Sequence, residues 1–422
     1  MVHVKKGKVI AGKAKTMDRV ILHCDCNSFF ASVESAINPE YKKVPLAVCG
    51  EVENRHGIVL AKNDLAKAFG VKTTETVYSA RKKCPKLVVV QPHYELYAEY
   101  SRRANEIYSR YTDMIEPFGI DESWLDVTAS EKIFGNGYEI AKKISSDIKR
   151  ELGITVSIGV SFNKVFAKLG SDYKKPDAIT VIDRSNYKDI VYKLPASDML
   201  FVGKKTAEML WRMGIRTIGD LANVDLDLLV SHFGKAGKML YDYSRGLDDS
   251  PVSSHDDKNA KSISASFTFK RDLLSFEECR VGLEYLCEEI ASKLRDRGLL
   301  SRTVQIAVKD EKLNVSQKQM ACETPTDISD EISKTALQLL YGFWSEGRPV
   351  RMLSVTATSL IKSDVCSSQI TLFDDGSADR EKCKKREKTI DEIRQKYGRE
   401  SIIKGAMLNS DIGIYKAPEK KN

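Results

Sequence analysis

Apolar and polar positions recur with two different periods along the first 185 residues, which predicts strands and helices in alternation. We expect strands at 19–26, 45–50, 58–62, 87–91 and 154–161, and helices at 28–37, 94–111 and 136–152, with further helical stretches up to about residue 83. Two more strands are expected around a turn at Asp121-Glu122-Ser123. This order predicts an α/β core with a small inserted lobe.

Residues 263–362 follow a different order. Their first strand alternates cleanly, with Ile263, Ala265, Phe267 and Phe269 on one face and Ser264, Ser266, Thr268 and Lys270 on the other. Helices are expected at 275–298 and 327–345, and strands near 302–310, 313–321 and 350–360. The order β-α-β-β-α-β is that of a split ferredoxin-like domain. Its sheet would offer one apolar face to the helices and leave one polar face uncovered.

Three segments connect or follow these parts. Residues 186–247 consist of short helical stretches separated by glycines, which predicts a small helical domain. Residues 248–262 are polar and turn-rich, the composition of a linker. Beyond residue 362 we expect a polar tail with one charged helix at about 379–397. The fold class is therefore α+β with several domains.

Composition adds limits to this interpretation. A chain of 422 residues predicts about three or four domains. The net charge of +8 suggests an anionic partner, but the basic excess lies in residues 1–20 and 379–422, so a basic groove must come from local arrangement. Nine cysteines occur without zinc-type spacing, and no segment has the apolar length of a membrane span. We expect a soluble, cytoplasmic protein without a membrane partner, and a monomer, whose residues 1–17 form a basic extension.

Three acidic residues carry the clearest chemical signal. The apolar run Val20-Ile21-Leu22 leads directly to Asp25, and Asp121 and Glu122 lie at the predicted turn between two strands. A carboxylate at the end of a buried strand is costly unless a cation meets it. Strand ends that bring such carboxylates together would form an oxygen-only site suited to Mg²⁺. From the residues alone, a set of surface caps and turn acids explains them equally well.

Three motifs occur in a fixed order, "HCDCNSFFASVE" at 23–34, "GIDESWLDVT" at 119–128 and "SIGVSFNKVFAKLGSDYKKPD" at 157–177. In this order and spacing, the chain resembles the Y-family translesion DNA polymerases of the DNA polymerase IV type, from about residue 18 to 373. The resemblance implies a right-hand architecture with a ferredoxin-like palm, small fingers, a helical thumb and a little finger. The corresponding ranges are 18–27 and 93–185 for the palm, 28–92 for the fingers, 186–247 for the thumb and 263–362 for the little finger.

The resemblance also assigns roles around the acids. Asp25, Asp121 and Glu122, with the main-chain carbonyl of Cys26, fall on the ligands of two Mg²⁺ ions. Phe30 falls on the steric gate against the ribose, although its helical spacing with Val33 and Ile37 also fits ordinary core packing. The implied nucleotide-binding residues are Phe29, Phe30, Lys67 and Lys175, of which Phe29 is interpreted as packing beside the gate.

Three positions depart from the pattern of the family. The fingers carry Asp64 and Lys67 where a Tyr and an Arg are usual, so one phosphate donor becomes an acid and the other loses its forked geometry. Asn27 stands where a second Asp is common. These departures leave the affinity for nucleotides and the exact subfamily open, but not the class of enzyme that the chain resembles.

Contacts with DNA and with a partner protein are implied further along the chain. The segment "FVGKKTAEML" resembles a helix-hairpin-helix, in which Gly203, Lys204 and Lys205 would approach a DNA phosphate. In the little finger, Lys270, Arg302 and Arg351 are the expected phosphate contacts. "QITLF" at 369–373 resembles the peptide that docks to a sliding clamp, with Gln369, Leu372 and Phe373 as its anchors.

The function implied is template-directed addition of dNTPs to a primer 3′ end on primer–template DNA, with error-prone synthesis past damage. Two alternatives stay open at this point. One is a polymerase-like DNA-binding accessory protein without catalysis, which Asp64 favours. The other is a nucleotide cyclase built on a similar palm, against which the helix-hairpin-helix and the clamp-type peptide argue.

Overall fold

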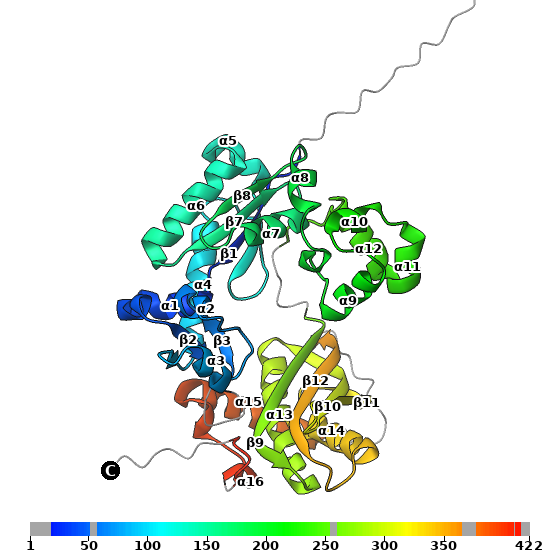
Figure 1. Cartoon of the computed structure of the whole chain (residues 1–422). Helices are drawn as coiled ribbons and strands as arrows, with labels where there is room; N and C mark the ends of the chain where they lie inside the picture. The colour runs from blue at the N-terminus through cyan, green and yellow to red at the C-terminus, as the bar shows by residue number, and fades with distance from the viewer. Residues whose placement is uncertain (1–17, 51–56, 254–259, 365–376, 409, 415–422) are drawn as a thin grey trace, which may run out of the picture. The chain divides into compact units, whose positions relative to one another are not determined.

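The computed structural model of the chain describes residues 18–50, 57–253, 260–364, 377–408 and 410–414. They belong to two compact units, which meet in the sequence at His255 and Asp256 (Figure 1). The basic extension at 1–17 and the clamp-type peptide at 369–373 lie outside the described residues and stay predictions. In the described ranges, no helix combines the length and apolar composition that a membrane crossing requires.

A five-stranded sheet forms the centre of the first unit. Its order is β5 (Ile115–Pro117), β6 (Glu122–Asp126), β1 (Ile21–Cys26), β7 (Val156–Ser161) and β8 (Ile179–Ile182). β1 is antiparallel to both β6 and β7, and all six of its residues are buried. The strands expected at the acidic positions are therefore neighbours, and Asp25 lies near the end of a strand that is buried throughout.

Helices cover both faces of this sheet. α4 (Tyr94–Tyr108) and α6 (Gly137–Leu152) pack on the face that carries Leu22 and Cys24, whereas α7 (Lys164–Tyr173) packs on the face that carries Ile21. α7 approaches β7 so closely that a Cβ at Gly159 would lie 1.8 Å from the carbonyl oxygen of Ala167. Only glycine permits that approach. The face shared with α7 is also the face of Asp25, because alternate residues of a strand point the same way.

The lobe inserted after β1 is the predicted fingers region. Its sheet has the order β3 (Val59–Lys62), β2 (Leu46–Cys49) and β4 (Val88–Val90). The helices of this region are α1 (Phe29–Ile37), α2 (Asp64–Ala68) and α3 (Val77–Lys83), with a 3₁₀ turn at Pro39–Lys43. α1 packs against β2, β3 and α4, so it connects the lobe to the palm.

The predicted helical domain follows β8 in the same unit. It contains α8 (Tyr187–Val191), α9 (Lys204–Arg212), α10 (Ile218–Asn223), α11 (Leu226–Phe233) and α12 (Lys235–Ser244). The core of this helical domain includes Leu210, Ile218, Leu221 and Leu240. A further short helix, α5 (Glu131–Phe134), lies outside it and precedes α6 in the palm. The side chain of Asn163, at the start of α7, donates to the carbonyl oxygen of Gly246 at 2.9 Å. The helical domain is therefore tied to the palm beside α7.

The linker expectation needs a correction for residues 248–253. Val252 is 1% exposed and packs with Ile21 and Trp124 of the palm. The guanidinium of Arg19 donates to the carbonyl oxygens of Asp248 and Ser250 at 3.0 and 2.8 Å. An apolar anchor with main-chain partners fixes this stretch to the palm, so residues 248–253 are packed structure and not a linker.

The second unit has the β-α-β-β-α-β order that the sequence predicts. Its elements are β9 (Ser262–Leu273), α13 (Phe276–Asp296), β10 (Leu299–Lys309), β11 (Val315–Thr326), α14 (Ser329–Phe343) and β12 (Val350–Lys362). The sheet order is β11-β10-β12-β9, and each pair is antiparallel. α13 and α14 cover one face, as Figure 1 shows. Across the other face, neighbouring strands pair small neutral residues such as Ser264 with Thr356 and Ser266 with Ser354.

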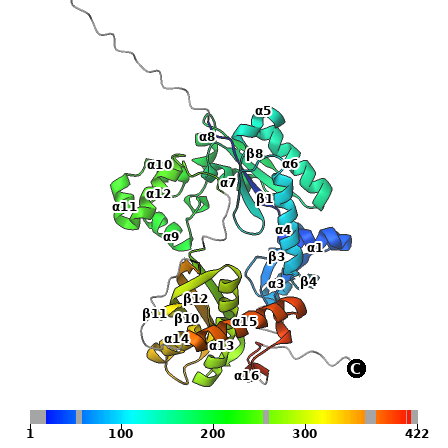
Figure 2. The same ribbon diagram turned by 180° about the vertical axis from the view of Figure 1, so that it is seen from behind.

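The charged helix expected at about 379–397 is confirmed, but the expectation of a polar tail is wrong for residues 377–408 and 410–414, because they pack onto the second unit. α15 (Ser377–Tyr397) and α16 (Gly405–Leu408) contact α13, as the view from behind in Figure 2 shows. Met407 and Ile412 are each 2% exposed and belong to the hydrophobic core of that unit. The main-chain N–H of Lys270, on the edge strand β9, donates to the carbonyl oxygen of Ile412 at 3.0 Å.

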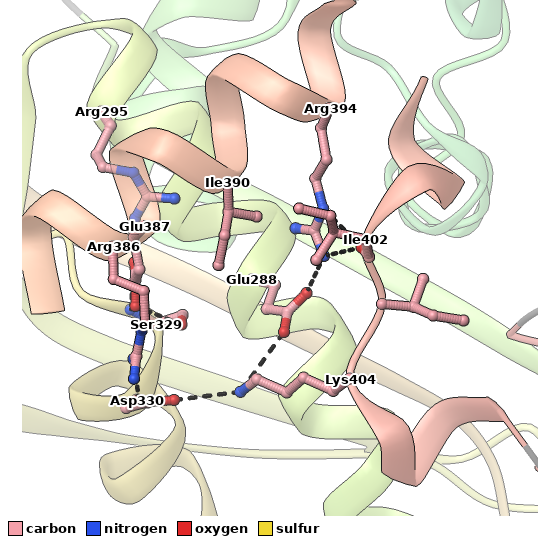
Figure 3. Close-up of a pocket in the computed structure, with 11 residues that line it drawn as sticks. Glu288, Arg295, Ser329, Asp330, Arg386, Glu387, Ile390, Arg394, Ile402 and Lys404 are labelled. Atoms are coloured by element: carbon pink, nitrogen blue, oxygen red, sulfur yellow. Dashed lines mark hydrogen bonds and ion pairs between the residues drawn. The ribbon is translucent and has the colours of Figure 1, made fainter. Parts of the chain in front are cut away.

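Charged contacts hold α15 in place. Glu387 is almost fully buried, accepts hydrogen bonds from the main chain and hydroxyl of Ser329 at 3.0 and 2.7 Å, and pairs with Arg295. Asp391 pairs with the same guanidinium at 2.6 Å. A cavity of about 260 Å³ lies beside these pairs. Among its lining residues, Lys404 lies between Glu288 and Asp330 (Figure 3). Its charged walls are already paired with one another, so we interpret it as part of this packing.

Replacing Glu387 by Ala tests this packing. The change leaves Arg295 buried with one partner fewer, so we expect the free energy of unfolding of the second unit to fall by about 3 kcal/mol. Glu381→Ala on the same helix removes only an exposed pair with Lys385, and should change it by less than about 0.5 kcal/mol. Urea unfolding of both full-length variants measures the difference. Equal small losses would contradict a packed α15.

Candidate active site

The three acidic residues meet at one end of the β1–β6 pair. Asp25 lies directly opposite Glu122 in the register of the two strands. Asp121 precedes β6 at the turn of the β5–β6 hairpin, and its carbonyl oxygen accepts a hydrogen bond from the N–H of Cys26 at 3.0 Å. The main chain of Cys26 therefore lies at the same end as the carboxylates. The hairpin position of Asp121 and Glu122 is confirmed.

Two lysines contact these carboxylates. Nζ of Lys175 lies 2.5 Å from Oδ2 of Asp25, and Nζ of Lys168 lies 2.5 Å from Oε2 of Glu122. Asp172 joins the two, at 2.7 Å from Lys175 and 3.9 Å from Lys168. Lys168 and Asp172 are on α7, so the helix that packs on the Asp25 face also supplies the charges around the acids.

Burial and pairing shift the pKa values of the acids in different directions. Burial raises the pKa of Asp25 to about 6, although the nearby Lys175 opposes the shift. Burial, followed by the charge of Glu122, also raises the pKa of Asp121. Burial alone would raise the pKa of Glu122 as well, but the contacts from His23 and Lys168 outweigh it and lower this pKa to about 2. Glu122 is thus firmly ionised, while Asp25 lacks sufficient positive charge around it.

The donor set fits hard divalent cations. Three carboxylates and a main-chain carbonyl provide only oxygen, the ligand type that Mg²⁺ prefers. The ammonium groups of Lys168 and Lys175 mark where positive charge is favoured. In the described chain, no group of three His, Cys, Asp or Glu side chains is arranged to hold a metal ion as it stands.

Phe30 and Phe29 occupy different surroundings. Phe30 is partly buried and stacks on Tyr97, with ring centroids 4.2 Å apart and 13° between the planes. The hydroxyl of Tyr97 donates to Glu34 at 2.5 Å, one helical turn after Phe30. Phe29 is 3% exposed in the palm core, so its ring is not available to a nucleotide, which corrects its place among the nucleotide-binding residues.

Local contacts explain the departure from the family pattern at Asn27, and the surroundings of Asp64 and Lys67 explain the departures in the fingers in part. The side chain of Asn27 donates to Thr155 at 3.0 Å and accepts from Ser157 at 2.8 Å, so it ties β1 to β7. Asp64 and Lys67 are both exposed on α2. Lys62, which the sequence did not single out, is near Lys67, and burial together with that charge lowers its pKa.

The remaining predicted residues are spread over other surfaces. Gly203, Lys204 and Lys205 are exposed at the N-terminus of α9, where a Cβ on Gly203 would meet nothing within 4 Å. In the second unit, the side chains of Lys270 and Arg302 are exposed and Arg351 is half-buried. Gly203, Lys204 and Lys205 belong to the same unit as the acids, whereas Lys270, Arg302 and Arg351 belong to the other, so the two sets are separate candidate contacts.

Sequence reasoning missed two residues beside the acids, His23 and Lys168. A signal existed for His23, because it precedes Asp25 by two residues on a strand and therefore shares its face. Lys168 precedes Asp172 by one helical turn in the third motif. Neither pattern says which residues of β1 and α7 touch, because that depends on how the helix packs.

Known proteins match the chain along most of its length. The impB/mucB/samB family matches residues 24–172, and the C-terminal domain of that family matches residues 260–372. A thumb domain described for DNA polymerase-iota matches residues 198–248. These matches fall on the palm and fingers, on the second unit and on the helical domain.

Similar proteins bear related names. DNA polymerase IV of Acetivibrio thermocellus is 46% identical over 399 residues, which cover 94% of this chain and 99% of that protein. DNA polymerase IV 2 of Bacillus subtilis is 35% identical over 400 residues, which cover 93% and 95%. The Y-family DNA polymerase chimera Dbh-Dpo4(243-245)-Dbh has a similar structure, with a TM-score of 0.72 and 25% identity over 81% of this chain and 99% of that chain. The chain therefore belongs to the Y family of DNA polymerases, among the DNA polymerase IV proteins.

Proposed function

We propose that the chain is a DNA-directed DNA polymerase that extends primers on damaged templates, and that Asp25, Asp121 and Glu122 hold its catalytic cations. The observation that carries this proposal is the meeting of the three carboxylates, with the Cys26 main chain, at one end of β1 and β6. When bound, two Mg²⁺ ions there would activate the primer 3′-hydroxyl and stabilise the leaving pyrophosphate. The raised pKa of Asp25 supports a site that needs added positive charge.

The nucleotide triphosphate has three kinds of partner near these acids. Lys175 is a compact cation that can turn from Asp25 to phosphate oxygens once other cations balance the acid. The first N–H groups of α1 have no partner within the helix, and a helix N-terminus attracts anions. Lys67 of α2 supplies a further positive charge from the fingers, with Lys62 beside it. Together they offset the acid at position 64.

Phe30 serves as the steric gate in this proposal. Its ring is held by stacking on Tyr97, and α1, which carries it, begins three residues after Cys26, the last residue of β1. A rigid aromatic wall rejects a ribose 2′-hydroxyl by contact and leaves deoxyribose unaffected.

DNA contacts are proposed on two separate surfaces. The N-terminus of α9, with Gly203, Lys204 and Lys205, offers main-chain N–H groups and charge to one phosphate. The neutral open face of the β9–β12 sheet suits a shape-based approach to duplex, and Lys270, Arg302 and Arg351 add phosphate contacts at positions around it. Docking of Gln369, Leu372 and Phe373 to a sliding clamp, and action as a monomer close to chromosomal DNA, complete the proposal.

Asp121→Asn combined with Glu122→Gln tests the metal assignment. Both changes keep side-chain size and remove the anionic oxygens, so primer extension should fall on the order of a thousandfold. Binding to primer–template, measured by fluorescence anisotropy, should stay within about threefold, because phosphate contacts elsewhere supply most of the affinity. Asp113→Asn, an exposed acid of the same domain, is the matched control and should extend normally. Extension by the double variant at the wild-type rate would refute the assignment.

Phe30→Ala tests the gate. Removal of the ring should raise the ratio of kcat/KM for rNTPs over dNTPs by about a hundredfold, because the wall against the 2′-hydroxyl is gone. Phe29→Leu is the control, since it trims the buried neighbour and should lower Tm without changing the ratio. If Phe30→Ala behaves like Phe29→Leu, with lower Tm and an unchanged ratio, Phe30 is a packing residue.

A further inference from the structure

His23 is a fully buried imidazole that touches the proposed metal site without belonging to it. It lies on β1 two residues before Asp25 and is 0% exposed. Its ring meets the ring of Trp124 edge to face at 5.2 Å. An apolar residue would fill this space without the cost of desolvating two ring nitrogens, so the polar atoms of His23 call for an explanation.

Each ring nitrogen faces one side chain. Nδ1 lies 2.8 Å from the hydroxyl oxygen of Ser171 on α7, and Nε2 lies 3.2 Å from Oε2 of Glu122. Among the residues that the structure describes, Nε2 has no aligned hydrogen-bond partner, so Glu122 is the group within its reach. Hydrogen bonds at catalytic groups are often loosely aligned before substrate binds and tighten afterwards.

The chemistry of these partners fixes the tautomer. An ionised carboxylate only accepts hydrogen bonds, so the proton must be on Nε2 for the ring to hold Glu122. Nδ1 then accepts, and the hydroxyl of Ser171 has to donate to it. That hydroxyl can also donate to the carbonyl oxygen of Lys168 at 2.8 Å, and Nδ1 would then carry the proton and leave Nε2 without one. The direction in which the Ser171 hydroxyl donates therefore determines whether Nε2, the nitrogen that faces Glu122, carries the proton.

The contacts of Glu122 are one-sided. Both His23 and Lys168 approach Oε2, at 3.2 and 2.5 Å. Within the described part of the chain, no hydrogen bond reaches Oε1. One oxygen of Glu122 is thus held by His23 and Lys168, and the other is left without a hydrogen bond in the described part of the chain.

We infer that His23, oriented by Ser171, is a positioning residue that holds Oε2 of Glu122 so that Oε1 is presented to the catalytic divalent cations. The inference rests on the proposed function, because it assigns a support to one of its ligands. Metal-binding groups commonly depend on such a supporting hydrogen bond, and its loss costs about 10- to 100-fold in metal affinity or activity.

Lys168 does not make His23 redundant. Its side chain is long, partly exposed and also near Asp172, so it can move when a nucleotide brings new negative charge. His23 has no such freedom, because β1, Trp124 and α7 enclose it. The close approach of α7 at Gly159 keeps Ser171 at the ring. The contact between His23 and Glu122 therefore persists when a nucleotide binds, whereas the contact between Lys168 and Glu122 can break.

Four variants of the full-length chain separate positioning from packing. His23→Leu keeps the volume and removes both nitrogens, whereas His23→Gln places an amide N–H near the position of Nε2. Ser171→Ala removes only the hydroxyl that orients the ring. Ser161→Ala is the matched control, because its buried hydroxyl donates to the carbonyl oxygen of Ile182 at 2.7 Å in the same domain but touches no residue of the site.

Mn²⁺ affinity is the direct measurement. Each variant is bound to a primer–template with a dideoxy-terminated primer and a non-hydrolysable dNTP analogue, and electron paramagnetic resonance counts free Mn²⁺. DNA binding and Tm are measured in parallel. We expect His23→Leu to weaken Mn²⁺ binding and to lower kcat by about 10- to 100-fold, with DNA affinity and the KM for dNTP nearly unchanged. Ser171→Ala should act in the same direction, His23→Gln should recover part of the loss, and Ser161→Ala should bind Mn²⁺ like the wild type.

Other outcomes overturn the inference. Wild-type Mn²⁺ affinity in both His23→Leu and Ser171→Ala, whatever their Tm, would make His23 a packing residue. Equal losses in His23→Gln and His23→Leu would show that the Nε2–H donor is irrelevant. If the wild-type complex itself bound no Mn²⁺, the proposed metal site and this inference would both be wrong. If the wild type bound Mn²⁺ and the variants bound it equally well, only the role of His23 would be wrong.

Discussion

The burial of the Asp25 carboxylate at the end of a fully covered strand is the constraint that shapes the palm. An acid in that place is costly unless positive charge and hydrogen bonds surround it. Lys175 approaches to 2.5 Å, yet burial still raises the pKa of Asp25 to about 6. The site is thus organised for more positive charge than the chain itself supplies. Divalent cations and a nucleotide would complete the balance, with the cations at the acids and the lysine at the phosphates.

One helix provides most of this organisation. α7 lies on the Asp25 face of the sheet and brings Lys168, Ser171 and Asp172 to the acids, and the chain that follows it brings Lys175. Its distance from the sheet depends on Gly159, where any side chain would collide with the backbone of α7. Gly159, a strand residue far from the acids in sequence, therefore determines how closely α7 brings its charged side chains to the acids. Chemistry at the end of β1 depends on packing in the middle of β7.

The sequence predicted those features that depend on local periodicity or on a strand ending in an acid. The other strands of the palm and fingers, the order of the second unit and the meeting of Asp25 with Glu122 follow from such patterns, whereas β8 was not predicted. The supports of the acids did not, because His23 and Ser171 are 148 residues apart and meet only through the packing of α7. The C-terminal helix was predicted at about 379–397, but its packing onto the second unit was missed for a related reason. Its composition is that of a solvated tail, and its buried Glu387 finds Arg295 and Ser329 far away in sequence. Val252 was missed because one apolar residue in a polar stretch has no period.

The central claim is that the acids exchange lysine for divalent cations when substrate binds. A crystal structure of the chain with primer–template, a non-hydrolysable dNTP analogue and Mn²⁺ tests it most directly, because Mn²⁺ is located by its anomalous scattering. The account predicts anomalous peaks within coordination distance of Asp25, Asp121 and Glu122, and Nζ of Lys175 moved from Asp25 to a phosphate oxygen. Anomalous peaks elsewhere, or Lys175 still paired with Asp25 beside a bound nucleotide, would contradict the account.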